Sequence, residues 1–153
     1  MKIAVFSDSH GNVENMISAI EDFRPDHVIH LGDKVEDADF IAGHYPLLPL
    51  LSVPGNCDYA PTMESSRLVE LGGVRIFLSH GHRHGVKMGL DAFANSVFCS
   101  GSQLGLYGHT HAAHLTELEG MQLFNPGACG GYSPTYGQII IENRKAVCTI
   151  VKF

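Results

Sequence analysis

The sequence predicts a mixed α/β (α+β) sandwich, with parallel strands and crossover helices in its first half and antiparallel strands in its second half. The first half alternates short β-branched apolar runs with amphipathic segments, a pattern typical of parallel strands joined by helices. The second half has apolar runs separated by tight turns, a pattern typical of hairpins. With 153 residues, 44% of them hydrophobic and 17% charged, the chain suits one domain spanning residues 1–153.

The first elements form a strand–helix–strand unit. Lys2–Ser7 is an apolar β-branched run that predicts a buried strand, and Val13–Phe23 repeats apolar residues at helical spacing. His27–Leu31 predicts a second strand parallel to the first, and Leu50–Val53 a third. The acidic segment Lys34–Pro49 is expected to be exposed, with room for a short helix.

The remaining elements are mostly hairpins. A second helix is expected at Gly85–Ser96, and a buried strand at Leu104–Tyr107. The expected hairpins pair Arg67–Leu71 with Val74–Ser79, Ala113–Leu118 with Met121–Phe124, and Gly137–Glu142 with Ala146–Lys152. Residues 125–134 are rich in Gly and Pro and predict a loop.

Composition excludes several classes of function. A net charge of −6 is unfavourable for electrostatic binding to nucleic acid or to an anionic membrane. No apolar run approaches the ~20 residues that span a bilayer, and no signal peptide is expected. The four cysteines lack CxxC spacing, which predicts reduced thiols in a cytoplasmic protein. Ten histidines beside ten Lys plus Arg favour metal or acid–base chemistry.

Five short polar clusters follow apolar runs. They are Asp8-Ser9-His10, Gly32-Asp33, Gly55-Asn56-Cys57-Asp58, Ser79-His80-Gly81-His82 and Gly108-His109-Thr110-His111. Their order suggests that several strand ends converge on one rim. Asp8 and His10, like His109 and His111, are two residues apart and in extended chain project to the same side. The set is too large for one ion, whereas two divalent ions ~3.5–4 Å apart, bridged by one carboxylate, would use it fully.

A simpler interpretation competes for each residue alone. Asp8 or Asn12 could cap the first helix, and Asp37 is expected on a solvated face. His30 is expected to serve packing or to lie on the surface. Ordinary loop polarity does not account for seven ligands that recur together after apolar runs.

These five motifs together resemble the calcineurin-like metallophosphoesterase superfamily. The short chain and its Gly55-Asn56-Cys57-Asp58 variant are similar to the small bacterial and archaeal phosphodiesterases of the YfcE type. The resemblance extends from Asp8 to about Gly127. It implies a four-layer αββα fold, a β-sandwich with flanking helices.

The resemblance also implies two metal sites. Asp8, His10, Asp33 and His111 would hold one ion, and Asp33, Asn56, His80 and His109 the other. Mn²⁺ is the first expectation, with Fe²⁺, Zn²⁺ or Ni²⁺ as alternatives for such ligands. The implied activity is metal-dependent phosphodiesterase activity, the hydrolysis of a phosphodiester bond by a hydroxide bound to the dinuclear metal centre. Small phosphodiesters are the expected substrates. Nucleic acid is not an expected partner, unless a small or cyclic nucleotide is the substrate.

One position departs from the family pattern. Many members have His, which can protonate the leaving group, where this chain has Cys57. A thiol is a weaker general acid at pH 7, so either good leaving groups are preferred or His82 substitutes. We expect Asn12 to contact a phosphate oxygen and Asp58 to orient His10 or His80.

Two other functions stay open. One is a phosphomonoesterase or protein phosphatase on the same metals, and the other is a non-catalytic scaffold like the retromer subunit that resembles this fold. Complete ligands at all seven positions favour catalysis. The sequence does not decide the physiological substrate or the native metal. It also leaves open whether the chain forms a homo-oligomer, because the apolar stretch Leu47–Leu51 could cover a neighbouring subunit or complete the core.

Overall fold

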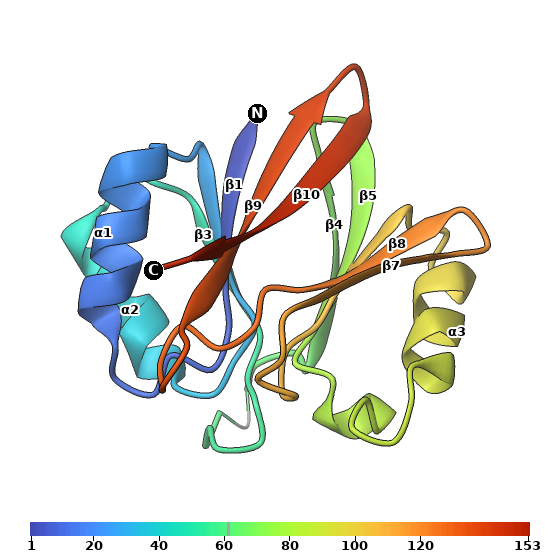
Figure 1. The fold of residues 1–153 in the computed structure, drawn as a ribbon, viewed down its shortest axis with the longest axis horizontal. Helices are drawn as coiled ribbons and strands as arrows, with labels where there is room; N and C mark the ends of the chain where they lie inside the picture. Colours follow the sequence, from blue (N-terminus) through green and yellow to red (C-terminus); the bar gives the residue numbers. More distant parts are fainter. Residues whose placement is uncertain (61) are drawn as a thin grey trace.

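The computed structural model describes residues 1–60 and 62–153 and confirms a mixed sandwich of two sheets flanked by helices (Figure 1). In chain order the elements are β1 (Lys2–Phe6), α1 (Val13–Phe23), β2 (His27–His30), α2 (Val35–His44), β3 (Leu50–Ser52), β4 (Ser66–Leu71), β5 (Val74–Ser79), a 3₁₀ turn (His82–His84), α3 (Asp91–Cys99), β6 (Leu104–Leu106), β7 (His114–Leu118), β8 (Met121–Asn125), β9 (Thr135–Glu142) and β10 (Lys145–Lys152). None of the helices in the described ranges is long and apolar enough to span a membrane.

The first sheet has the strand order β10-β9-β1-β2-β3. Strands β1, β2 and β3 are parallel, as expected from the strand–helix–strand pattern. The last hairpin, β9–β10, joins this sheet because β9 pairs antiparallel with β1. The two ends of the chain therefore build one sheet together.

The second sheet has the order β4-β5-β6-β8-β7. Its centre is parallel, since β6 pairs in parallel with both β5 and β8, while β4 and β7 are antiparallel edge strands. The expectation of an antiparallel second half was therefore wrong in detail. Hairpin signals identify neighbours in the chain, but they do not show how separate hairpins pair within a sheet.

Three apolar clusters separate four layers. The largest lies between the sheets and includes Ile3, Ile29 and Leu78. A second lies beneath α1 and α2, with Met16, Ile20 and Ile41 against the first sheet. The third cluster lies beneath α3 on the outer face of the second sheet and contains the buried aromatic side chains of Phe93 and Tyr107. Helices thus cover both outer faces, as in the αββα arrangement (Figure 1).

Two helical predictions need correction. The acidic segment forms α2, and Asp37 on this helix is buried rather than solvated. The helix expected at Gly85–Ser96 begins at Asp91 instead. Gly85 has φ = 62° and Gly89 has φ = 154°, and these angles are incompatible with a continuing right-handed helix.

The parallel strands β1, β2, β3, β5 and β6 all end at the same edge of the sandwich, the lower edge in Figure 1. Carboxyl ends of parallel strands are where α/β folds place their ligand-binding residues. Each of the five polar clusters follows one of these strands. The topology thus brings distant segments of the chain to one edge.

Candidate metal centre

The structure places six of the seven expected ligands in two clusters that share Asp33. One cluster comprises Asp8, His10, Asp33 and His111, and the other Asp33, His80 and His109. Within each cluster, one potential ligand atom per residue lies within 4.8 Å of all the others. The seventh residue, Asn56, has its Oδ1 atom 3.2 Å from His80 Nε2 and therefore lies beside the second cluster.

The first cluster contains an unsatisfied buried carboxylate oxygen. Asp8 is fully buried, and its Oδ2 accepts hydrogen bonds from the Ser7 hydroxyl at 2.6 Å and the His109 amide at 3.1 Å. Its Oδ1 has no hydrogen-bond partner in the part of the chain that the structure describes, although His111 Nε2 lies 3.1 Å away. A buried anionic oxygen without a donor is costly, so this atom is suited to a cation.

The second cluster contains an oriented histidine. The Nδ1 atom of buried His80 lies 2.7 Å from the Leu31 carbonyl oxygen and donates to it. With its proton on Nδ1, the ring presents the Nε2 lone pair to Asp33 Oδ1, 3.5 Å away, and to Asn56 Oδ1. Metal-binding imidazoles are held in this way, with the second ring nitrogen donating to a carbonyl.

This donor set fits divalent cations. Lone pairs of carboxylate, imidazole and amide groups face one another across short distances, and a positive charge between them would relieve the repulsion. Oxygen and imidazole nitrogen ligands suit Mn²⁺, Fe²⁺, Zn²⁺ and Ni²⁺. No thiol of the four free cysteines belongs to either cluster, so the arrangement differs from structural zinc sites.

Asp33 is held ionised at the shared position. Burial by itself raises the pKa of Asp33, but the Cys57 amide, which donates to Oδ1 at 2.9 Å, and the nearby His80 together bring that pKa below its ordinary value. A carboxylate charged at neutral pH is suited to binding a cation.

The backbone at the ligands is unusual. Asp8, His10, Asp33, His109 and His111 all have positive φ, between 46° and 68°. This left-handed region is uncommon for residues other than glycine, and each such residue costs on the order of 1–3 kcal/mol. Five strained ligands at one edge indicate that the surrounding structure enforces these loops, as is typical of functional sites.

Asp58 has different partners from those expected. Its carboxylate accepts hydrogen bonds from the backbone amides of Asp33, Lys34, Val35 and Gly55, at 2.8–2.9 Å. The predicted contact with His10 or His80 is not among its hydrogen bonds, so the expectation was wrong about the partner. Asp58 instead fixes the Asp33 loop against the loop that carries Asn56.

Asn12 and His82 lie beside the clusters. The side-chain amide of Asn12 donates to the Ser9 carbonyl at 2.8 Å and does not cap α1. The His82 ring lies 5.4 Å from that of His80 and 6.1 Å from that of His109, measured between centroids. Burial, together with those two histidines, lowers the pKa of His82. Its Nδ1 atom is buried and has no hydrogen-bond partner among residues 1–60 and 62–153.

The Cys57 side chain is exposed next to the shared ligand. Its partial desolvation and the adjacent Asp33 raise the pKa of the thiol, so Cys57 is protonated at neutral pH. Its backbone amide holds Asp33, and this contact does not require any particular side chain. The position thus has a structural role that sequence reasoning did not identify.

Sequence reasoning also missed a buried group behind the ligands, namely Ser9, His30 and Asp37. Asp37 looked like part of an exposed acidic run, and Ser9 is hidden between two conspicuous ligands. The one signal in the sequence was His30, a polar residue between apolar Ile29 and Leu31 at the end of a strand. The loop of residues 126–134 packs behind the same segment, since the Cys129 amide donates to the Ser7 carbonyl at 2.9 Å.

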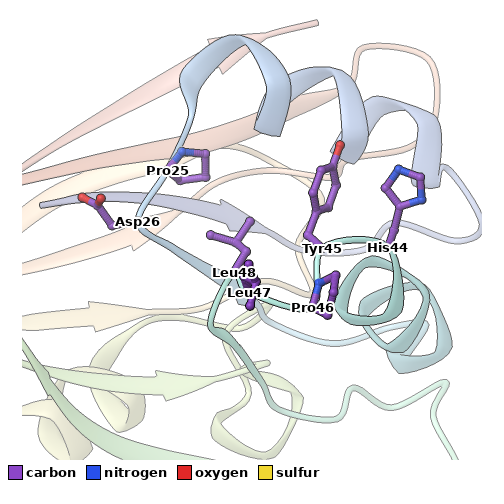
Figure 2. A pocket seen from close by; sticks show the side chains of 7 residues that line it. All are labelled: Pro25, Asp26, His44, Tyr45, Pro46, Leu47 and Leu48. Atoms are coloured by element: carbon purple, nitrogen blue, oxygen red, sulfur yellow. The ribbon is translucent and has the colours of Figure 1, made fainter.

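A separate cavity of about 540 Å³ lies away from these clusters, and Figure 2 shows the side chains that line it. It is formed by Pro25, Asp26 and the segment 44–48, at the amino ends of strands β2 and β3. Leu47 is 97% exposed there, whereas Leu48, Leu50 and Leu51 pack against the core. No expected ligand lines this cavity, so it is distinct from the metal centre.

Comparisons with known proteins agree with this geometry. Residues 1–144 match the model of the calcineurin-like phosphoesterase superfamily domain. The probable metallophosphoesterase YsnB of Bacillus subtilis is 33% identical over 134 residues, covering 84% of this chain and 75% of that protein. Phosphodiesterase MJ0936 of Methanocaldococcus jannaschii is 28% identical over 168 residues, covering 95% of this chain and 96% of that protein.

Solved structures share the fold. An archaeal phosphodiesterase aligns with a TM-score of 0.77 and 26% identity, covering 99% of this chain and 100% of that one. A mutant Vps29 from Entamoeba histolytica aligns with a TM-score of 0.78 and 20% identity, covering 100% of this chain and 99% of that one. The match to the domain model spans nearly the whole chain and includes every residue of both clusters. The protein therefore belongs to the calcineurin-like phosphoesterase superfamily and is a metallophosphoesterase.

Proposed function

We propose that this protein is a phosphodiesterase that works with two divalent metal ions bridged by Asp33. The observation that carries the proposal is the pair of ligand clusters that share this one buried carboxylate. Two-metal phosphoesterases hold two ions close together, and a carboxylate shared by both clusters would suit that arrangement. The related proteins named phosphodiesterase support the choice of a diester substrate.

The ligands divide between the two ions. Asp8, His10, Asp33 and His111 would hold one ion, and Asp33, Asn56, His80 and His109 the other. We propose Mn²⁺ as the first choice, because carboxylate, imidazole and amide ligands accept it readily. When bound, the ions would lower the pKa of a coordinated water towards ~7 and neutralise negative charge on the phosphate.

The residues of the chain then have separable roles. His80 is oriented by the Leu31 carbonyl, and Asp33 by the Cys57 amide, so both ligands are preorganised. Asp58 positions the loops that carry Asp33 and Asn56, and does not act on substrate. The Asn12 amide is exposed at the rim, where it could turn from the Ser9 carbonyl to a phosphate oxygen.

We further propose that His82 assists the leaving group in place of Cys57. Its ring lies beside His80 and His109, whereas the Cys57 thiol has a raised pKa. Its contribution should be largest on diesters with poor leaving groups, which depend most on a proton donor. An unchanged rate of His82→Ala on a diester with a poor leaving group would remove His82 from the mechanism.

The expected substrates are small. Two bound cations would make the site net positive within an acidic chain, so it can attract a phosphate without a basic surface. The same charge balance disfavours long nucleic acids but allows small or cyclic nucleotides. Free cysteines and the absence of CxxC spacing support a cytoplasmic location.

One assay separates this proposal from its two alternatives. Hydrolysis of bis-p-nitrophenyl phosphate and of p-nitrophenyl phosphate is measured with Mn²⁺ and with EDTA. We expect Mn²⁺-dependent turnover that is faster on the diester. Faster cleavage of the monoester would favour a phosphomonoesterase, and no metal-dependent turnover of either would favour a scaffold.

A further inference from the structure

Three buried polar side chains form a continuous hydrogen-bonded chain behind the metal-binding loops. Ser9 Oγ lies 2.7 Å from Asp37 Oδ2 and 2.9 Å from His30 Nε2. His30 Nδ1 in turn accepts a hydrogen bond from the Gly32 amide at 3.3 Å. Ser9 and His30 are fully buried, and Asp37 is 6% exposed. Buried polar groups are costly unless paired, so a connected set of them specifies one local arrangement.

The contacts determine the direction of each hydrogen bond. The Gly32 amide can only donate, so His30 Nδ1 is the acceptor and the ring proton lies on Nε2. The Nε2–H then donates to Ser9 Oγ, and the Ser9 hydroxyl donates to Asp37. Burial lowers the pKa of His30 to about 4, which keeps the ring in this singly protonated form at neutral pH. Each of the three donated protons in this hydrogen-bonded network thus has an acceptor.

The network forms hydrogen bonds with both loops that supply the first ligand cluster, the one of Asp8, His10, Asp33 and His111. Ser9 lies between the ligands Asp8 and His10, and the same Asp37 oxygen also accepts from the Gly11 amide at 2.7 Å. Asp8 and His10 have φ values of 52° and 46°, which are strained for residues other than glycine, so this segment needs external restraint. His30 reaches the second loop through Gly32, next to Asp33.

We propose that Ser9, His30 and Asp37 are positioning residues that hold the Asp8–Gly11 loop in its metal-binding conformation. His80 is held by the Leu31 carbonyl instead, and His109 follows β6 in the other sheet. The network therefore supports the cluster of Asp8, His10, Asp33 and His111 more than the cluster of Asp33, His80 and His109. This inference rests on the proposed function only in assuming that the two clusters bind metal ions.

The test measures metal binding directly, without an activity assay. Metal-free wild type, Ser9→Ala and Asp37→Ala are titrated with Mn²⁺ by calorimetry, with the bound Mn²⁺ counted at each step. We expect one of the two ions to bind about 10–100-fold more weakly in both variants, the usual effect of removing a partner of a metal ligand. The other ion should keep its affinity within a few fold.

Two controls separate positioning from general stability. Asp37→Asn keeps an oxygen acceptor for Gly11 and Ser9, so it should retain most of the affinity that Asp37→Ala loses. Asp39→Asn changes an exposed carboxylate on the same helix and should bind both ions as the wild type does. If Asp37→Ala does not fold, Ser9→Ala, which removes only a hydroxyl, decides the question.

The outcomes distinguish this inference from the proposed function. Folded Ser9→Ala protein that binds both ions with wild-type affinity overturns the positioning role, as does equal weakening of both sites. Wild-type protein that binds fewer than two ions instead contradicts the dinuclear proposal.

Discussion

At the scale of single residues, the site depends on backbone atoms packed directly against ligands. Gly108 lies behind Ser7 and Asp8, and an added Cβ there would overlap with Ser7 Oγ, which donates to Asp8 Oδ2, and would lie 3.0 Å from Asp8 Oδ2 itself. Neither neighbour can retreat easily, because both are fully buried. The glycine before the His109 ligand is therefore required by space rather than by its own φ.

Gly108→Ala should displace the Asp8 carboxylate. We expect the free energy of unfolding to fall by about 1–3 kcal/mol, the usual cost of overpacking a filled interior. We also expect the cluster that contains Asp8 to bind Mn²⁺ with lower affinity. Urea unfolding and Mn²⁺ titration measure the two effects. Gly43→Ala in α2 is the matched control, because a Cβ there meets nothing within 4 Å and should add up to about 1 kcal/mol of helix stability. Equal behaviour of the two variants would contradict the steric argument.

The buried His30 should make stability depend on pH. Its pKa is lowered to about 4 in the folded protein, from an ordinary value of 6.5, so between these values only the unfolded chain takes up the proton. The free energy of unfolding should thus decrease by up to about 3 kcal/mol as the pH falls from 6.5 to 4, and this component should not decrease further below pH 4. Urea unfolding of metal-free wild type and His30→Gln across this range isolates the effect. Parallel pH profiles would show that His30 is not responsible.

At the scale of elements, the apolar periodicity of the sequence predicted the helices and strands whose signals lie within their own residues. The α1 helix has the predicted bounds, and β5 also matches, because each carries its own apolar pattern and turn signals. The predicted start of helix α3 was wrong because of Val86. This residue lies in a loop, but its side chain is buried in the same core as Phe93, and the spacing of the two in the sequence resembles that of a helix. The partner of Asp37 lies 28 residues away in the chain, a separation that periodicity does not reveal.

The start of α2 depends on a residue from another loop. Asp58 accepts hydrogen bonds from the amides of Lys34 and Val35, where the side chain at the N-cap position makes no cap of its own. Asp58→Ala should lower the free energy of unfolding by about 1–3 kcal/mol, because it leaves these amides without an acceptor. Asp58→Asn keeps an acceptor oxygen and should lose less. Urea unfolding gives both values, and equal losses would show that charge rather than hydrogen bonding matters.

At the scale of the whole molecule, the metal centre joins the two sheets. Asp8, His10 and Asp33 follow strands of the first sheet, whereas His80, His109 and His111 follow strands of the second. The expected ligands could be named from the sequence because each motif is local. How the sheets combine could not, because β9 pairs with β1 from the opposite end of the chain and β8 pairs with β6 as well as with its hairpin partner β7. Ions bound at this edge would therefore crosslink the sandwich.

Metal removal should accordingly lower the thermal stability of the entire domain. At 100 times its dissociation constant, one bound ion adds about 2.7 kcal/mol, which corresponds to a rise in Tm of roughly 5–10 °C for a chain of this size. The Tm is compared in Mn²⁺ and in EDTA for wild type, Asp33→Asn and Asp39→Asn. The shift should shrink sharply in Asp33→Asn, which weakens the ligand shared by both clusters, and persist in Asp39→Asn. An equal Tm with and without Mn²⁺ in the wild type would mean that the ions do not bind the native state across the two sheets.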